Sequence, residues 1–216
     1  MQMKLYRIAF LLLILSALHI AGCRKKPDDP KKCKDCIVVY KPNIYIYPTQ
    51  TLNISVALDF PKGGRVVESI PTYGSGWNVT VTPEGKMNNQ YDYLFYESEQ
   101  PDEWQYKTGY TIARDSLEIF FNGNMNAYHF KANEIKDFID YWIPLLNDHD
   151  YYHIYPQERP VIEELIKVRF SSAPEHFLRL FYVVKGTNAP TSLKPHVINN
   201  TVPRTGYHAA EWGVVL

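Results

Sequence analysis

Hydrophobic and polar residues alternate along much of the chain beyond residue 40. Between residues 52 and 60, apolar side chains occupy every second position, with polar or small residues between them. A period of two is typical of a β-strand that buries one face. Similar β-rich runs lie at residues 44–47, 77–82, 91–97, 116–121, 151–155, 165–170 and 177–184. Turn-forming sequences separate several of these runs, so the pattern predicts many short antiparallel strands packed as a sandwich.

One segment has the period of a helix instead. From Asn133 to Leu146, apolar residues recur at intervals of three and four positions, which places them on one face of an amphipathic helix. Asn133 is suited to cap the start of this helix, and Pro144 is expected to kink or end it. The sequence therefore predicts a strand-dominated α+β domain with one main helix near residues 133–146, lying across a sheet or at one end of the sandwich.

The start of the chain has the pattern of a targeting segment. Two basic residues precede an apolar run of about eleven residues, which suits a secretory signal, whereas a membrane-spanning helix needs roughly 20 apolar residues. The sequence Ile20-Ala21-Gly22-Cys23 resembles the lipobox of bacterial lipoproteins. This resemblance implies a signal peptide at residues 1–22 and lipid attached to the Cys23 thiol, whose two or three acyl chains hold a protein stably on a membrane.

A charged, proline-rich spacer follows the lipobox. It offers almost nothing to bury, so we expect a flexible tether over residues 23–37 and a single β-rich domain over residues 38–216. The run from Lys25 to Asp29 loosely resembles the signal that sends lipoproteins of the Bacteroidota to the outer face of the cell. The expected location is therefore the bacterial cell envelope, in the outer membrane, with exposure at the surface.

Two further cysteines, Cys33 and Cys36, lie in the tether. A C-x-x-C sequence can form a redox centre or half of a zinc site. Neither a strand-to-helix context nor a second ligand pair at zinc-finger spacing accompanies it. In an oxidising compartment a small-loop disulfide between Cys33 and Cys36 is the simplest interpretation, with free or intermolecular thiols as the alternative.

Composition narrows the range of functions. Lys and Arg together number 23, as do Asp and Glu, so no excess of positive charge points to a nucleic-acid partner. The glycines at residues 63–64 and 74–76 do not form a phosphate-binding loop, and no serine lies in a G-x-S-x-G elbow. We therefore predict no nucleotide and no other cofactor. The aromatic content of 14% predicts instead a domain whose amphipathic aromatic side chains reach its surface.

His149 and His153 have the four-residue spacing of two zinc ligands on a helix. The residues around them predict a strand, on which side chains four positions apart lie about 13 Å from each other and cannot share one zinc ion. The two histidines are thus metal-ligand candidates only if the segment is helical. The prediction is that no metal binds there.

Two glutamates lie in aromatic surroundings. Glu97 ends a run of aromatic residues, and Glu211 precedes a tryptophan near the end of the chain. A glycosidase needs two such carboxyl groups, about 5 to 9.5 Å apart, and sugar rings stack on aromatic side chains. Glu97 and Glu211 are therefore catalytic candidates. The aromatic candidates for ligand binding are Trp77, Tyr93, Tyr96, Trp104 and Trp212.

The tripeptide Asp115-Ser116-Leu117 resembles the short O-glycan acceptor motif of Bacteroidota envelope proteins. The same three residues are also compatible with the ordinary start of a strand.

A wider set of motifs resembles an uncharacterised family of secreted and lipoprotein domains. It begins with the K-P-x-I-Y-x-Y-P phrase at residues 41–48, continues through Y-L-F-x-E at 93–97 and Y-W-x-P at 141–144, and ends with E-W-G at 211–213. This resemblance implies no known activity. It does imply that the first and last motifs bracket one domain, so we expect the strands near residues 44–47 and 207–215 to pair.

Three functions remain open. The first is a lipid-anchored envelope protein that binds a glycan or an envelope protein through aromatic surface, without catalysis. The second is a carbohydrate-active hydrolase that uses Glu97 and Glu211. The third is a structural lipoprotein, whose only predicted partner is the membrane that holds its lipid.

Overall fold

The computed structural model of the protein describes residues 36–198 and 201–216. The predicted signal peptide, the predicted lipidation site Cys23, Cys33 and most of the predicted tether lie outside the described residues. Cys36 is disulfide-bonded, and the other two cysteines of the chain are not among the described residues. No helix in the described part of the chain is long and apolar enough to cross a membrane.

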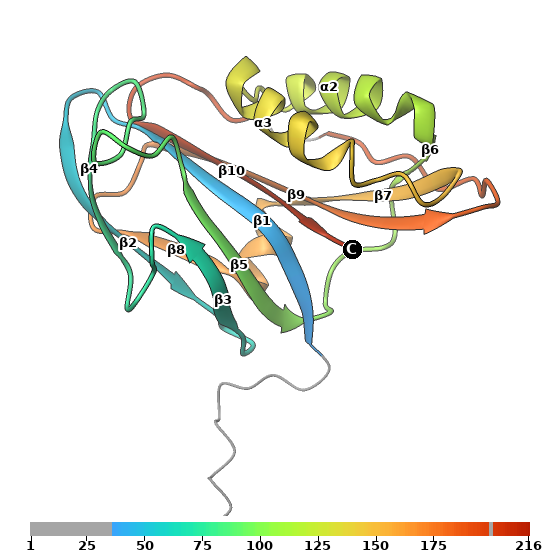
Figure 1. The fold of residues 1–216 in the computed structure, drawn as a ribbon, viewed down its shortest axis with the longest axis horizontal. Helices are drawn as coiled ribbons and strands as arrows, with labels where there is room; N and C mark the ends of the chain where they lie inside the picture. Colours follow the sequence, from blue (N-terminus) through green and yellow to red (C-terminus); the bar gives the residue numbers. More distant parts are fainter. Residues whose placement is uncertain (1–35, 199–200) are drawn as a thin grey trace, which may run out of the picture. The chain divides into compact units, whose positions relative to one another are not determined.

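Two β-sheets form the framework of the domain (Figure 1). The large sheet has the strand order β3-β5-β1-β10-β9-β7-β6, and the small sheet has the order β4-β2-β8. The large sheet comprises β1 (Cys36–Tyr47), β3 (Arg65–Ile70), β5 (Leu94–Pro101), β6 (Tyr110–Ala113), β7 (Tyr151–Glu158), β9 (His176–Thr187) and β10 (His208–Val215). The small sheet comprises β2 (Leu52–Asp59), β4 (Trp77–Val81) and β8 (Lys167–Phe170).

Helices cover the other face of the large sheet. Figure 1 shows α2 (Leu117–Ala127) and α3 (Ala132–Trp142) side by side above it, and a 3₁₀ turn (Arg114–Ser116) leads into α2. The short α4 (Arg159–Leu165) joins β7 to β8 and packs on the side of the small sheet. The large sheet is therefore the middle of three layers. The prediction of a strand-dominated, sandwich-like α+β fold is confirmed.

The alternation in β1 explains why the domain has two hydrophobic cores. Ile44 and Ile46 pack in the core between the two sheets. Tyr45 and Tyr47, the residues between and after them, pack in the core beneath α2 and α3. Successive side chains on a strand point to opposite faces, so residues 44–47, buried on both faces, are apolar or aromatic at every position.

The last strand, β10, lies in the centre of the large sheet. It pairs antiparallel with β1, with Ile44 opposite Glu211, which confirms the prediction that the first and last motifs pair. Its other neighbour, β9, is parallel to it, so the sheet is mixed. Parallel neighbours need a crossover connection. Here this crossover connection is the segment between β9 and β10, of which residues 188–198 and 201–207 are described.

The strand predicted at residues 116–121 is wrong, because these residues lie in the 3₁₀ turn and α2. Leu117, Phe121 and Met125 are the buried residues of this helix, at a spacing of four that continues past the apparent turn Asn122-Gly123. Ser116 and Asp115 are exposed at its start. The O-glycan motif therefore precedes a helix and not a strand, and its modification stays a prediction.

The predicted helix at residues 133–146 is α3, which runs from Ala132 to Trp142 and ends before Pro144. Its cap is Lys131 and not Asn133: the Glu134 side chain accepts a hydrogen bond from the Lys131 backbone N–H at 2.8 Å. The domain has two further α-helices, α2 and α4, in the described residues. The sequence therefore identified one helix of three.

Candidate functional site

Four of the five aromatic candidates are buried, which corrects the expectation that they form a binding surface. Trp77, Tyr96 and Trp104 pack in the core between the sheets, and Trp212 packs beneath the helices, with exposed fractions of 0–5%. A side chain at this depth holds sheets and helices together and does not reach a ligand. Tyr93 is the exception, because it is only partly buried and lines a pocket.

The structure does not bring Glu97 and Glu211 together. Glu211 is fully buried: its carboxylate pairs with the Arg179 guanidinium at 2.5 Å and accepts a hydrogen bond from the Tyr96 hydroxyl at 2.7 Å. Glu97 follows Tyr96 on β5 and points to the opposite face of the large sheet. The sheet itself separates the two carboxyl groups, so they do not flank a common cleft.

His149 and His153 do not share a helix. His153 lies in β7, and His149 lies in the turn that precedes this strand. His149 makes an ion-pair contact of 2.9 Å with Asp148. Within residues 36–198 and 201–216, no three or more His, Cys, Asp or Glu side chains gather in a group that could hold a metal ion.

A pocket of about 400 Å³ opens on the helix side of the large sheet, beside the last turn of α3. We call it the Lys41 pocket. Strands β1, β3 and β5, the loop before β5 and the last turn of α3 all contribute to its wall. The lining residues are Lys41, Glu68, Ile70, Gln90, Tyr91, Asp92, Tyr93, Phe95, Glu97 and Tyr141. Two of these lining residues, Tyr93 and Glu97, are candidates predicted from the sequence.

Lys41 enters the pocket from a β-bulge. The pairing of β1 with both of its neighbours shifts register just before Asn43, and the backbone of Lys41 has a φ of 52°. Positive φ is uncommon for a residue with a Cβ atom and is found where surrounding structure imposes it. Bulges re-aim side chains and occur often beside functional sites. The bulge therefore interrupts a regular strand at the lysine that lines the pocket.

Three aromatic rings surround the Lys41 ammonium. Its Nζ lies 4.6 Å from the ring centre of Tyr141, 4.9 Å from that of Phe95 and 5.5 Å from that of Tyr93. All three distances are within the range of cation–π attraction. Within the described residues, the Lys41 ammonium takes part in no ion pair or hydrogen bond. The direct contacts of this ammonium are thus with aromatic rings, and carboxylates act on it from a longer distance.

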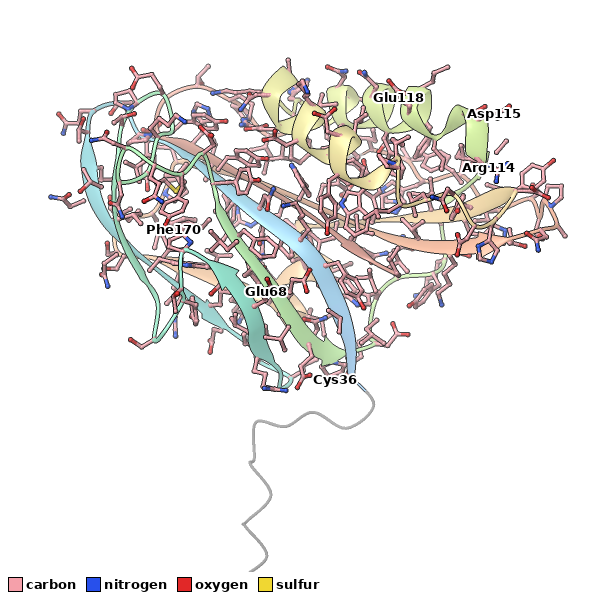
Figure 2. The ribbon with its side chains drawn as sticks, in the orientation of Figure 1. Cys36, Glu68, Arg114, Asp115, Glu118 and Phe170 are labelled. Atoms are coloured by element: carbon pink, nitrogen blue, oxygen red, sulfur yellow. The ribbon has the colours of Figure 1, made fainter. Side chains whose placement is uncertain are left out.

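Two carboxylates face this ammonium from neighbouring strands. Glu68 on β3 and Glu97 on β5 are direct cross-strand partners, and both line the pocket; Figure 2 labels Glu68 at this edge of the sheet. Burial raises the pKa of Glu97, and the negative charge of Glu68 raises it further, while Lys41 opposes the shift. Asp137 on α3 lies close enough to act on Lys41, and its carboxylate accepts a hydrogen bond from the Tyr45 hydroxyl at 2.9 Å.

Burial also affects the protonation of Lys41 itself. It lowers the pKa of Lys41, although the carboxylates of Asp137, Glu97 and Glu68 favour the charged form. Groups with shifted pKa values that gather in a pocket mark candidate functional sites. The Lys41 pocket combines such groups with aromatic walls and an opening to solvent.

Searches against models of protein families, curated proteins and solved structures gave no match to this chain. The motif resemblance to a family of secreted domains stays a prediction.

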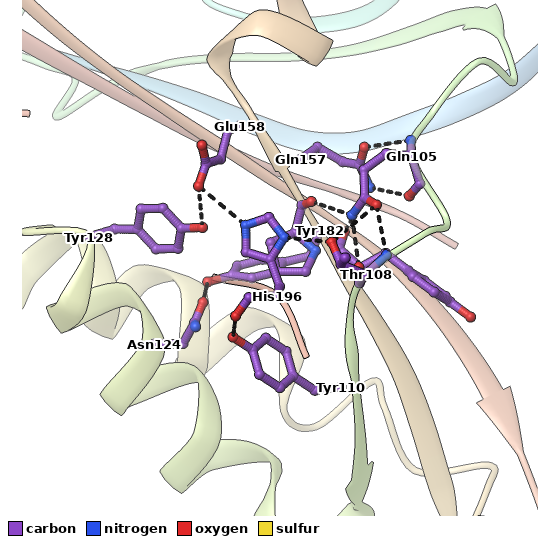
Figure 3. Close-up of polar contacts among 11 residues, drawn as sticks. Gln105, Thr108, Tyr110, Asn124, Tyr128, Gln157, Glu158, Tyr182 and His196 are labelled. Atoms are coloured by element: carbon purple, nitrogen blue, oxygen red, sulfur yellow. Dashed lines mark hydrogen bonds and ion pairs between the residues drawn. The ribbon is translucent and has the colours of Figure 1, made fainter. Parts of the chain in front are cut away.

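A second polar cluster includes His196 of the crossover connection (Figure 3). The His196 ring contacts Glu158 Oε1 through Nε2 at 3.2 Å and Thr108 Oγ1 through Nδ1 at 2.9 Å. A hydroxyl, an imidazole and a carboxylate in this order occur in nucleophilic hydrolases. The adjacent cavity, lined by Glu158 and Tyr128, measures about 30 Å³, which holds one water molecule and no substrate.

The same cluster has a clear structural role. The Tyr110 hydroxyl donates to the backbone carbonyl of His196 at 2.6 Å, and the backbone N–H of Gly109 donates to that of Lys194 at 2.9 Å. The crossover connection is thereby fixed along β6, the edge strand of the large sheet. Covering an edge strand prevents it from pairing with another chain. We therefore assign this cluster to stability and take the Lys41 pocket as the candidate functional site.

Sequence reasoning missed Lys41, Glu68 and Tyr141. Lys41 opens the K-P-x-I-Y-x-Y-P phrase, and Tyr141 opens Y-W-x-P, so both belong to recognisable motifs of the sequence. Nothing in the order of residues shows that a bulge aims Lys41 toward a helix that starts 91 positions later, at Ala132. The two residues come from motifs far apart in the sequence, and only the fold shows that these motifs meet.

Proposed function

We propose that this protein is a lipid-anchored protein of the bacterial cell envelope whose β-rich domain binds a ligand in the Lys41 pocket. The lipobox resemblance at Ile20 to Cys23 supports the anchor, and the run from Lys25 to Asp29 supports the location in the outer membrane. The pocket supports the binding role. The proposed protein acts by holding its ligand near the membrane surface, at a reach set by the short tether.

The observation that carries the proposal is the meeting of three kinds of group in one pocket. Aromatic rings offer flat apolar faces for stacking, Lys41 offers N–H donors that have no acceptor within the described residues, and Glu68 and Glu97 offer acceptors. Ligand sites are typically concave, largely apolar and equipped with a few converging polar groups. A glycan, or a polar side chain of an envelope protein, has the hydroxyl and amino groups that match this arrangement.

The hydrolase alternative loses its main support. It requires two carboxyl groups across a cleft, but Glu211 is buried in an ion pair with Arg179 on the other face of the sheet from Glu97. We therefore propose binding without catalysis by this pair.

The binding role can be tested by nuclear magnetic resonance on the ¹⁵N-labelled domain. We would titrate it separately with glucose, N-acetylglucosamine and glucosamine, and compare Tyr141→Ala with Ile119→Ala, an exposed residue of α2 outside the pocket. Amide shifts that cluster around the pocket, persist in Ile119→Ala and vanish in Tyr141→Ala would support the proposal. Shifts confined to other surfaces would contradict it.

The anchor needs a separate test. Cys23→Ala is expected to move the protein out of the membrane fraction of bacterial cells. If the variant stays there with its signal uncleaved, the lipoprotein reading is wrong. Protease treatment of intact cells then tests surface exposure. A protein exposed at the surface should be digested.

A further inference from the structure

The Lys41 pocket already holds a cation that belongs to the protein itself. The Lys41 ammonium lies within 5.5 Å of three ring centres, from β5 and α3. Aromatic cages of this kind recognise ammonium groups, because the negative faces of the rings attract a positive charge. The rings therefore create a site for an ammonium ion, and Lys41 is its present occupant.

The charges of the lining favour cations. Three carboxylates, those of Glu68, Asp92 and Glu97, face one lysine. Asp92 is paired with Lys86 at 2.7 Å, whereas neither Glu68 nor Glu97 takes part in an ion pair within the described residues. An anionic ligand would meet two unpaired negative charges. A ligand that carries an ammonium group would be attracted by both.

Lys41 is suited to leave the cage. Its ammonium sits on a flexible four-carbon stem and is held by rings without a hydrogen-bond acceptor among the described residues. The side chain is only partly buried, and the pocket opens to solvent. The ring of Tyr141, nearest to the ammonium, is itself 39% exposed. A ligand ammonium can therefore approach the cage as Lys41 swings away.

We propose that the pocket recognises its ligand through an alkylammonium group, which replaces the Lys41 ammonium among the rings of Tyr93, Phe95 and Tyr141. Lys41 then acts as a built-in competitor. It lowers the affinity for the ligand and keeps the cage filled when no ligand is present. This inference rests on the proposed binding function and specifies the chemical class of the ligand, such as an amino sugar or the side chain of a lysine.

The decisive probe pair is choline and 3,3-dimethylbutan-1-ol, its uncharged analogue of nearly the same shape. Each would be titrated into the ¹⁵N-labelled domain and followed through the amide signals of the pocket. Choline is expected to bind about 2- to 30-fold more tightly than the uncharged analogue, the range that cation–π attraction provides. Equal affinities would overturn the inference.

A variant of the competitor gives an independent test. Lys41→Asn shortens the side chain and keeps a residue that tolerates positive φ. If Lys41 fills the cage about nine-tenths of the time, removing it should strengthen choline binding about tenfold. Lys136→Asn, at an exposed lysine of α3, is the matched control and should leave the affinity unchanged. Weaker choline binding in Lys41→Asn would mean that Lys41 contacts the ligand directly, and would overturn the inference.

Tyr141→Leu keeps the inference testable if the Lys41 variant does not fold, because the exposed ring of Tyr141 can be replaced by an apolar side chain. It should weaken choline binding toward that of the uncharged analogue and leave the thermal midpoint unchanged. Choline binding that is unaffected by this change would count against the cage. If neutral sugars shift the pocket signals but choline does not, the ammonium inference fails and the binding function stands. If no probe shifts the pocket signals, both fail.

Discussion

Replacing Glu211 by glutamine should strongly destabilise the domain. Glu211 and Arg179 are both fully buried, and the Glu211 carboxylate also accepts the Tyr96 hydroxyl. Glu211→Gln keeps the shape of the side chain but removes its charge. The Arg179 guanidinium, which also donates to the Ile166 carbonyl at 2.7 Å, would then remain buried without a counter-charge.

The magnitude follows from the burial of the pair. Removing one partner of a buried ion pair typically lowers the free energy of unfolding by about 3–5 kcal/mol. A domain of this size has a total stability of roughly 5–15 kcal/mol, so the loss is a large fraction of it. For a domain of roughly 180 residues, the same loss lowers the thermal midpoint by about 6–20 °C. An exposed catalytic carboxylate would show no such effect.

Urea denaturation followed by tryptophan fluorescence measures this loss. The control is Glu99→Gln, since Glu99 pairs with Arg65 at 2.6 Å at the surface, where the arginine side chain is 57% exposed. That change should lower stability by less than about 1 kcal/mol. The double variant Arg179→Met/Glu211→Leu should be more stable than Glu211→Gln, because it leaves no buried charge. If Glu211→Gln unfolds at the same urea concentration as the control, the structural role given to Glu211 is wrong.

Three further outcomes are expected. Gly64→Ala should lower stability by about 1–3 kcal/mol, because the φ of Gly64 is +135° and a Cβ atom would lie 2.4 Å from the Glu99 carbonyl oxygen. Gly123→Ala, in open space on α2, should instead raise stability by about 0.5–1 kcal/mol. If the urea midpoints of the two glycine variants move in the same direction, this prediction is wrong. Burial lowers the pKa of His208, so below about pH 6.5 the unfolded chain binds a proton that the folded domain does not bind. Stability should therefore fall as the pH falls through this range. His208→Gln should flatten this part of the plot of stability against pH. His196→Ala should speed hydrogen exchange in the crossover connection and not in β10, and unchanged exchange would refute its anchoring role.

The strands could be predicted because burial on one face leaves a period of two. Ile54, Val56 and Leu58 are buried in β2 as the alternation indicated. The helix α2 was missed because its buried residues repeat every four positions from Leu117 to Met125, beyond the six residues that looked like a strand. A short apolar run does not distinguish a strand from a helix. Length and the continuation of the pattern decide between them.

The candidate site could be predicted only in part. Glu97 and Tyr93 were found because charged and aromatic residues stood out in one short run. The carboxylate that faces Glu97 is Glu68, and their meeting depends on the register of β3 against β5. Register is set by the whole sheet and its bulges, and a shift of one residue would turn every side chain to the other face. The same reason explains why Glu211, although close to an aromatic residue in sequence, lies in the core.

The position of β10 also has a consequence for the timing of folding. A chain that emerges with its N-terminus first delivers β3, β5 and β1 as one block and β9, β7 and β6 as another, and these blocks become neighbours only through β10. Pairing across such sequence separations is slow. The large sheet cannot close before the final strand is available. If the chain crosses a membrane N-terminus first, as the predicted signal peptide implies, this topology delays closure of the large sheet until β10 has followed the rest across.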